Sequence, residues 1–211
     1  MNVGPVTRHD YAREAQFHVP LPNNNLPLVF VTETALRAIF DHAVEGFPME
    51  IGGYYLGFPL VDRDSRVKAT FIEEVIRAIT TSTRTHVTMH AETFNAVEQR
   101  RAVTNNVLVG YYHSHPALGI FQSCEDVLNF RSGHPEDYQI AIVADSSLAK
   151  SDSLEPHESW IGFFAWDAAH NPIKLPPENL FVLQSKDSAF TLIPDSEPPP
   201  KQSSKLSEED G

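Results

Sequence analysis

The most constraining stretch of this 211-residue chain is NVLVGYYHSHP, at residues 106–116. Its apolar and aromatic run predicts a buried β-strand, and Pro116 ends that strand because proline lacks the N–H that a strand ladder needs. Alternate residues of a strand project from the same face, with Cα atoms ~6–7 Å apart. His113 and His115 are therefore predicted to point the same way from the end of a buried strand.

Strand-like and helix-like segments alternate on both sides of this stretch. Strands are predicted at 28–31, 49–61, 67–79, 138–145, 160–167 and 181–184, and helices at 34–44, 92–103 and 124–132. The segment 67–79 fits a helix or a strand, and its β-branched residues and flanking turn signals favour the strand. Thr32 or Thr34 is suited to cap the first helix. The alternation predicts an α/β domain with a mixed central β-sheet flanked by helices.

The two ends of the chain differ in composition from its centre. Residues 1–26 mix prolines, asparagines and charges without periodicity, and residues 186–211 are acidic and rich in proline and serine. Such compositions are typical of disordered segments. We therefore expect an N-terminal extension at 1–26, one domain at 27–185 and a disordered tail at 186–211.

Charge and cysteine content limit the class of protein. The formal net charge of −12 argues against a nucleic-acid surface or an anionic membrane as the main partner. The single cysteine, Cys124, has no partner for an internal disulfide, which indicates a reducing compartment. The first 25 residues contain no apolar run suited to a signal peptide, and no stretch is long enough to span a bilayer. These features predict a cytoplasmic protein.

Ser123 and Asp126 stand at the start of the helix predicted after the two histidines. A carboxylate in that first turn can point back toward the strand end. Two imidazoles, one carboxylate and an open fourth position form the ligand pattern of a catalytic zinc, although other divalent ions accept the same ligands. Ser123 and Asp126 also fit a helix capping box, which would need no further role.

A zinc hydrolase also needs a general base that is not itself a ligand. Glu50 opens the apolar, glycine-containing strand predicted at 49–61, an unusual place for a carboxylate unless the strand lies at an edge. Glu73 and Glu74 are competing candidates. No glycine-rich segment lies beside them to allow close approach, so Glu50 is favoured.

Other histidines and the cysteine suggest alternative sites. Cys124 could be the nucleophile of a cysteine peptidase, but a cysteine at this helix position is more often a small packed residue. His86 and His90 have metal-ligand spacing on a helix but lack the glutamate of the zincin motif, so we interpret them as surface or strand-end residues. His134 and His157 lie in polar segments, where solvated histidines are expected.

The segments PMEIGGYYLG (48–57) and VGYYHSHPALGIFQSCED (109–126) resemble the JAMM (MPN+) metallopeptidases. That family includes the proteasome-lid deubiquitinase, the signalosome deneddylase and bacterial relatives found with ubiquitin-like conjugation genes. Its pattern, E-x-x-G-x-x-x-G followed by H-x-H-P-x6-S-x2-D, is present here as Glu50, Gly53, Gly57, His113, His115, Pro116, Ser123 and Asp126. The resemblance covers residues 28–185 and implies a single MPN/JAB domain with a cytidine-deaminase-like layout. Tyr111 and Gln122 depart from the common tryptophan and leucine, and we expect neither to touch a ligand.

The resemblance implies a zinc-dependent isopeptidase or peptidase with one Zn²⁺ per chain, held by His113, His115 and Asp126. Glu50 would be the general base that then returns the proton to the departing amine. The Ser123 hydroxyl would help zinc to stabilise the oxyanion. The substrate implied is the C-terminal tail of ubiquitin or a ubiquitin-like protein, joined through its glycine to a lysine or to a linear extension.

The partners implied are a ubiquitin-like protein and enzymes of its activation and conjugation, in a bacterial setting that includes antiviral defence. The tail would bind by strand addition beside the zinc, and the loop predicted at 146–159 either lines that groove or is a mobile connection. Alternatives are a non-catalytic MPN scaffold subunit, a processing peptidase for a sulfur-carrier protein, a small-molecule amidase and a DNA-repair relative. The complete ligand set disfavours the scaffold, and the acidic charge disfavours the DNA-repair relative.

Overall fold

The computed structural model describes residues 24–61, 66–149 and 160–183, together with Pro22 and the residue pairs Gln16–Phe17 and Thr191–Leu192. The predicted extension at 1–26 and the predicted tail at 186–211 fall largely outside these residues, as does His157. The boundaries of the domain at 27–185 stay predictions. None of the described helices is long and apolar enough to cross a membrane.

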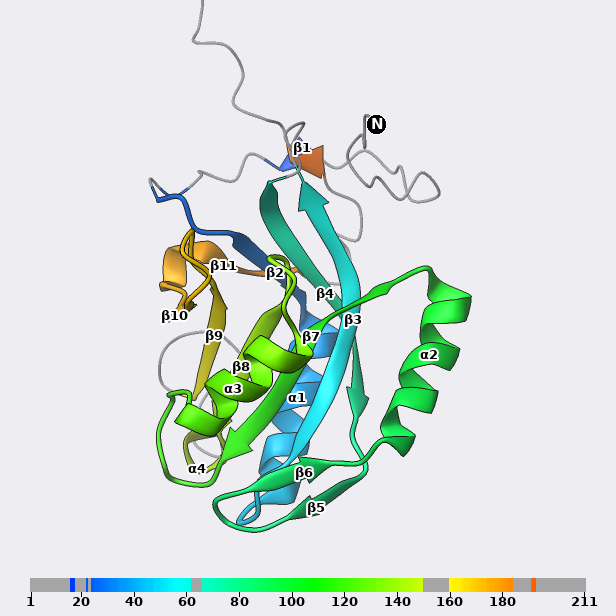
Figure 1. The fold of residues 1–211 in the computed structure, drawn as a ribbon, viewed down its shortest axis with the longest axis vertical. Coiled ribbons are helices and arrows are strands. Elements are labelled where there is room, and N and C mark those ends of the chain that lie inside the picture. The colour runs from blue at the N-terminus through cyan, green and yellow to red at the C-terminus, as the bar shows by residue number, and fades with distance from the viewer. Residues whose placement is uncertain are drawn as a thin grey trace, which may run out of the picture.

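An eight-stranded mixed sheet forms the centre of the molecule (Figure 1). Its strands are β2 (Leu28–Thr32), β3 (Gly52–Val61), β4 (Val67–Arg77), β7 (Val107–His115), β8 (Ile140–Asp145), β9 (Ile161–Trp166), β10 (Pro172–Lys174) and β11 (Leu180–Leu183). They lie in the order β10-β9-β8-β7-β3-β4-β2-β11. β7 pairs parallel with β8 and antiparallel with β3, so it lies in the middle of the sheet.

Helices lie on both faces of this sheet. They are α1 (Glu33–Gly46), α2 (Glu92–Thr104), α3 (Cys124–Gly133) and α4 (Ser146–Ala149), with a 3-10 turn η2 (Pro177–Asn179). Two-residue strands β1 (Gln16–Phe17) and β12 (Thr191–Leu192) pair with each other, and β5 (Thr80–Ser82) pairs with β6 (Val87–Met89). The predicted mixed α/β fold is confirmed.

One face of the sheet is covered by α1 and α4. α1 begins where the Thr32 side chain accepts a hydrogen bond from Ala35 N at 3.1 Å, so Thr32 is the cap. Its inward stripe places Leu36 and Ile39 against the sheet in one core with Trp160. Removing these fully buried side chains from water contributes on the order of 1.5–3 kcal/mol each.

The opposite face of the sheet is covered by α2 and α3. Val97 of α2 and Phe130 of α3 are both fully buried there, in a second core that includes Tyr111 of β7. Phe130 stacks on Trp166 of β9, with ring centroids 4.1 Å apart. Beyond the bulge that precedes Gly110, alternate residues of β7 share the side that Tyr111 faces, so His113 and His115 project toward α3.

The predicted strands and helices are confirmed, with differences at short elements. The ambiguous segment 67–79 is strand β4, paired on both sides. The β5–β6 hairpin and β10 were not predicted, because strands of three residues are too short to show periodicity. Glu50 precedes β3 by two residues instead of opening it. Residues 146–149 form α4, and 150–159 of the predicted loop lie outside the described residues.

Gly110 is a position of β7 where a side chain does not fit. Its φ of +147° disfavours residues with a Cβ, and an added Cβ would lie 1.8 Å from the Ile140 carbonyl oxygen on β8. That carbonyl also accepts a hydrogen bond from the Tyr55 hydroxyl of β3. The close approach therefore joins three neighbouring strands at the level just before the histidines.

We expect Gly110→Ala to lower the free energy of unfolding by about 3 kcal/mol, because strain and overpacking add at this site. Gly133→Ala is the matched control, since a Cβ there would meet nothing within 4 Å. Urea denaturation of both variants measures the difference. Equal midpoints for the two variants would contradict the close approach of β7 and β8.

Candidate metal centre

His113 and His115 lie at the carboxyl end of β7, on its α3-facing side. Both residues are buried, with 3% and 4% of their surface exposed. Their Nε2 atoms lie 3.1 Å apart. Two imidazoles are thus held with one nitrogen each directed at the same small volume.

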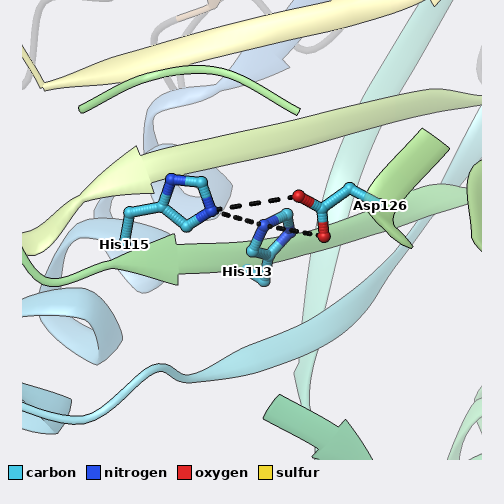
Figure 2. Close-up of side chains that lie close together, drawn as sticks. All are labelled: His113, His115 and Asp126. Atoms are coloured by element: carbon cyan, nitrogen blue, oxygen red, sulfur yellow. Dashed lines mark hydrogen bonds and ion pairs between the residues drawn. The ribbon is translucent and has the colours of Figure 1, made fainter. Parts of the chain in front are cut away.

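Asp126 approaches the two histidines from the first turn of α3. Its Oδ1 lies 3.4 Å from His113 Nε2, and its Oδ2 lies 4.0 Å from His115 Nε2. Figure 2 shows the carboxylate directed at both rings. Its position comes from the capping box, in which Ser123 N donates to Asp126 Oδ2 at 2.7 Å and Asp126 N donates to Ser123 Oγ at 3.1 Å. The predicted capping box is confirmed, and it turns the carboxylate toward the strand end.

The spacing of these donor atoms fits a tetrahedral zinc ion. With zinc–ligand distances of ~2.0–2.1 Å, the ligand atoms of a regular tetrahedron lie about 3.3–3.4 Å from one another. The two Nε2 atoms lie 3.1 Å apart, and the nearest Asp126 oxygens are Oδ1 at 3.4 Å from His113 and Oδ2 at 4.0 Å from His115. The two nitrogens and one oxygen lie within 4.8 Å of one another. Three protein ligands leave the fourth position for water or substrate.

His115 is held in the tautomer that a metal ligand needs. Its Nδ1 lies 2.9 Å from the Gly119 carbonyl oxygen, and because a carbonyl only accepts, Nδ1 must carry the hydrogen. The Nε2 lone pair is then directed at the cluster. Burial and the nearby charge of His113 lower the pKa of His115, which favours the neutral ring that binds metal.

Asp126 stays ionised although it is largely buried. Burial alone would raise its pKa, but hydrogen bonding and charge from His113 outweigh this effect, with hydrogen bonds from Ser123, and hold the pKa well below its usual range. The Tyr111 hydroxyl donates to the Asp126 carbonyl oxygen at 3.3 Å. The expectation that Tyr111 touches no ligand residue is therefore wrong, because its ring reaches from β7 to α3.

Glu50 lies in the segment that leads into β3. Gly52 pairs with His113 across the β3–β7 ladder, which places Glu50 near the end of β7. Glu50 is 5% exposed, and burial raises the pKa of its carboxyl, opposed by the charge of His113. Among the described residues, its carboxylate has neither a hydrogen-bond nor an ion-pair partner. A buried carboxylate of this kind is a candidate general base.

None of the alternative residues named next belongs to the cluster. Glu74, a competing base, pairs with Arg100 of α2. Cys124 is exposed, so its expected packed position is wrong: the first residue of α3 faces solvent. His86 and His90 flank β6, as expected for strand-end residues.

His134 is not the solvated loop residue that was expected. It is 7% exposed and stacks on Tyr111, with ring centroids 4.8 Å apart. His134 directly follows α3, and the end of that helix places it against the sheet, beside the second core. The polar residues next to it in the sequence gave no indication that it is buried.

The β5–β6 hairpin lies beside the cluster and was missed in the sequence. The Thr83 carbonyl accepts from Glu50 N at 2.8 Å, and His86 Nδ1 lies 3.6 Å from Glu125 Oε1 in the first turn of α3. The turn of the hairpin therefore contacts both the Glu50 segment and the helix that carries Asp126. Repeated threonines and serines in this stretch gave only a weak strand signal.

Comparison with known proteins gives a family match and similar structures. Residues 32–158 match a family described as prokaryotic homologs of the JAB domain. The uncharacterized protein F37A4.5 of Caenorhabditis elegans is 33% identical over 125 residues, which cover 56% of this chain and 36% of that protein. The chain thus spans about a third of the length of this curated relative, the matched share being 36%.

Two solved structures align with this chain. Protein DSY2949 from Desulfitobacterium hafniense aligns with a TM-score of 0.54 at 16% identity, over 77% of this chain and 99% of that chain. AF2198, a JAB1/MPN domain protein from Archaeoglobus fulgidus, aligns with a TM-score of 0.41 at 15% identity, over 72% and 97%. The DSY2949 match supports the fold alone.

We expect the protein to bind one zinc ion and Asp126→Asn to weaken that binding about 100-fold, because the amide is neutral while its oxygen can still accept from Ser123 N. Glu125→Gln is the matched control, since it removes a neighbouring charge from the same turn. Competition with a chromophoric chelator measures both affinities. Equal losses in the two variants would mean that only the local charge matters.

We also expect the buried His134 to make stability depend on pH. Burial lowers its pKa to about 4 from 6.5, so as the pH falls the unfolded chain takes up a proton before the folded one. The free energy of unfolding should fall by roughly 1–2 kcal/mol between about pH 7 and about pH 5, and His134→Gln should remove this part of the fall. His86→Gln, at an exposed position, should leave it unchanged, and the reverse pattern in urea denaturation would contradict the assignment.

Proposed function

The chain belongs to the family of prokaryotic JAB-domain homologs, and from this premise we propose that it is a zinc-dependent isopeptidase or peptidase of the JAMM type. The substrate proposed is a ubiquitin-like protein, cleaved after its C-terminal glycine. The observation that carries the proposal is the convergence of His113, His115 and Asp126, whose donor atoms lie within 4.8 Å of one another, beside the buried Glu50. The JAB family also includes non-catalytic members, but a scaffold would have no need for such a ligand set.

A zinc ion bound by the three ligands would supply Lewis-acid activation of a water molecule and of the scissile carbonyl. Glu50 takes the proton from the attacking water and delivers it to the departing amine. Its burial suits both steps, because a raised pKa brings the carboxyl closer to the pH at which it must accept and release a proton. Its position is fixed through the hydrogen bond from Glu50 N to the Thr83 carbonyl.

Ser123 has a second role beside its capping bond. Its hydroxyl accepts from Asp126 N, and a hydroxyl that accepts still has a hydrogen to donate. We assign that hydrogen to the oxyanion that develops on the scissile carbonyl. A lost donor of this kind typically costs on the order of a hundredfold in rate.

The β5–β6 hairpin supplies the substrate surface in this proposal. Among the described residues, β5 and β6 pair with each other as a separate two-stranded sheet, which leaves backbone groups on the outer edge of each strand. An extended, glycine-ended tail can add to such an edge by main-chain hydrogen bonds. Exposed Phe121, whose ring lies 4.8 Å from that of His115, offers an apolar contact next to the scissile bond.

We expect Glu50→Gln to retain zinc and to lose turnover by at least about 1,000-fold, because the amide cannot accept the proton from water. The assay is cleavage of a panel of ubiquitin-like fusions, both linear and lysine-linked, by zinc-loaded protein. Glu74→Gln is the control, since Glu74 was the rival base and pairs with Arg100 outside the cluster.

Three outcomes of this assay distinguish the roles proposed for Glu50 and for the protein. Cleavage after a terminal glycine by wild-type and Glu74→Gln protein, absent with Glu50→Gln, supports the proposal and begins to name the modifier. A fully active Glu50→Gln protein would remove Glu50 from the mechanism. A wild-type protein that binds no zinc would favour the scaffold instead.

A further inference from the structure

Asp145 is a buried carboxylate for which the proposed chemistry has no use. It is the last residue of β8 and pairs in register with His115, the last residue of β7. It is 3% exposed. Burying a carboxylate is costly unless hydrogen bonds stabilise its charge, so its partners indicate what it holds in place.

Both oxygens of Asp145 accept hydrogen bonds, and they serve two different segments. Oδ1 accepts from Ser147 N at 3.0 Å, Ser147 Oγ at 2.7 Å and Leu148 N at 3.3 Å, which caps the short helix α4. Oδ2 accepts from Gly119 N at 2.8 Å, and Oδ1 also lies 3.3 Å from Ala117 N. The carboxylate therefore connects α4 to the loop that follows β7.

This loop has a backbone shape that needs support. Ala117 and Gly119 both have left-handed backbone angles, with φ of 65° and 88°. For a residue with a Cβ, such a conformation costs on the order of 1 kcal/mol or more, so the loop needs contacts that stabilise it. Asp145 accepts from the N–H group of each of these two residues.

The same glycine fixes the histidine ligand. Gly119 donates its N–H to Asp145 Oδ2, and its carbonyl accepts from His115 Nδ1 at 2.9 Å. These two groups flank a single Cα atom. A shift of Gly119 therefore changes the orientation of the His115 ring, and with it the direction of the Nε2 lone pair.

We propose that Asp145 is a positioning residue of the metal centre, which holds the 116–119 loop in the shape that lets the Gly119 carbonyl orient His115. The inference rests on the proposed function, because it assumes that His115 binds zinc. It goes beyond capping, since a cap for α4 uses Oδ1 and does not need Oδ2 on Gly119.

The test distinguishes the roles of the two Asp145 oxygens, with each variant made in the full-length chain. Asp145→Asn retains a carbonyl oxygen that can cap α4, but its NH₂ group cannot accept from Gly119 N. Asp145→Ser retains a capping hydroxyl that is too short to reach the loop. Ser147→Ala is the matched control, because it removes a bond to Oδ1 and leaves the Gly119 contact in place.

We expect both Asp145 variants to bind zinc about 10–100-fold more weakly than wild type, the usual effect of losing a group that orients a ligand. The visible spectrum of the cobalt-loaded protein should also change, because the His115 ring is no longer held in one orientation. Ser147→Ala should keep zinc affinity within about threefold of wild type and the cobalt spectrum unchanged, whatever it does to the unfolding midpoint.

Three results would overturn the inference in distinguishable ways. Wild-type affinity and spectrum in both Asp145 variants would reduce Asp145 to a helix cap and leave the metal centre intact. An equal loss of affinity in Ser147→Ala would trace the effect to α4. A wild-type chain that binds neither zinc nor cobalt would remove the metal centre together with the role of Asp145.

Discussion

Two hydrogen bonds between Ile51 and Ser114 fix the geometry on which the site depends. Ser114 N donates to the Ile51 carbonyl at 2.9 Å, and Ile51 N donates to Ser114 Oγ at 3.0 Å. Ser114 stands between the two histidines, and Ile51 directly follows Glu50. These two hydrogen bonds therefore set the distance between the candidate base and the candidate ligands. The Ser114 side chain, which accepts the second bond, lies on the face of β7 opposite the histidines.

Burial and hydrogen bonding give the two carboxylates of the site opposite tendencies. Asp126 receives hydrogen bonds from His113 and Ser123, and its pKa is held low, so it is a permanent anion suited to a cation. Glu50 has no such donor among the described residues, and burial raises its pKa. The two carboxylates therefore suit different roles, Asp126 that of a metal ligand and Glu50 that of an acid–base group. The difference arises mainly from His113, which hydrogen-bonds to Asp126 and adds its charge, and further from Ser123 at the start of α3, whose N–H reaches Asp126 and not Glu50.

The parts of the site that could be predicted from sequence are those set by local geometry. A strand places His113 and His115 on one face through its period of two, and a capping box specifies Ser123 and Asp126 within four residues. The sheet strands followed from apolar runs. Contacts between distant elements could not be predicted: the burial of His134, the hairpin beside Glu50 and the bonds of Asp145 all depend on packing. A polar residue that ends a buried strand, as Asp145 does, was the available signal.

The overlap between cap and ligand explains why the motif at Ser123 and Asp126 was ambiguous. The same two side chains satisfy the first turn of α3 and present a carboxylate to His113, so a structural and a functional reading describe one arrangement. A helix start is a rigid support, whereas the proposed substrate surface lies on the short β5–β6 hairpin. The catalytic residues on the sheet and at the helix start can therefore stay the same while the sequence of the hairpin, and with it the substrate that it binds, varies. Under this proposal, substrate identity depends on the hairpin, and reaction type depends on the residues at the end of β7 and the start of α3.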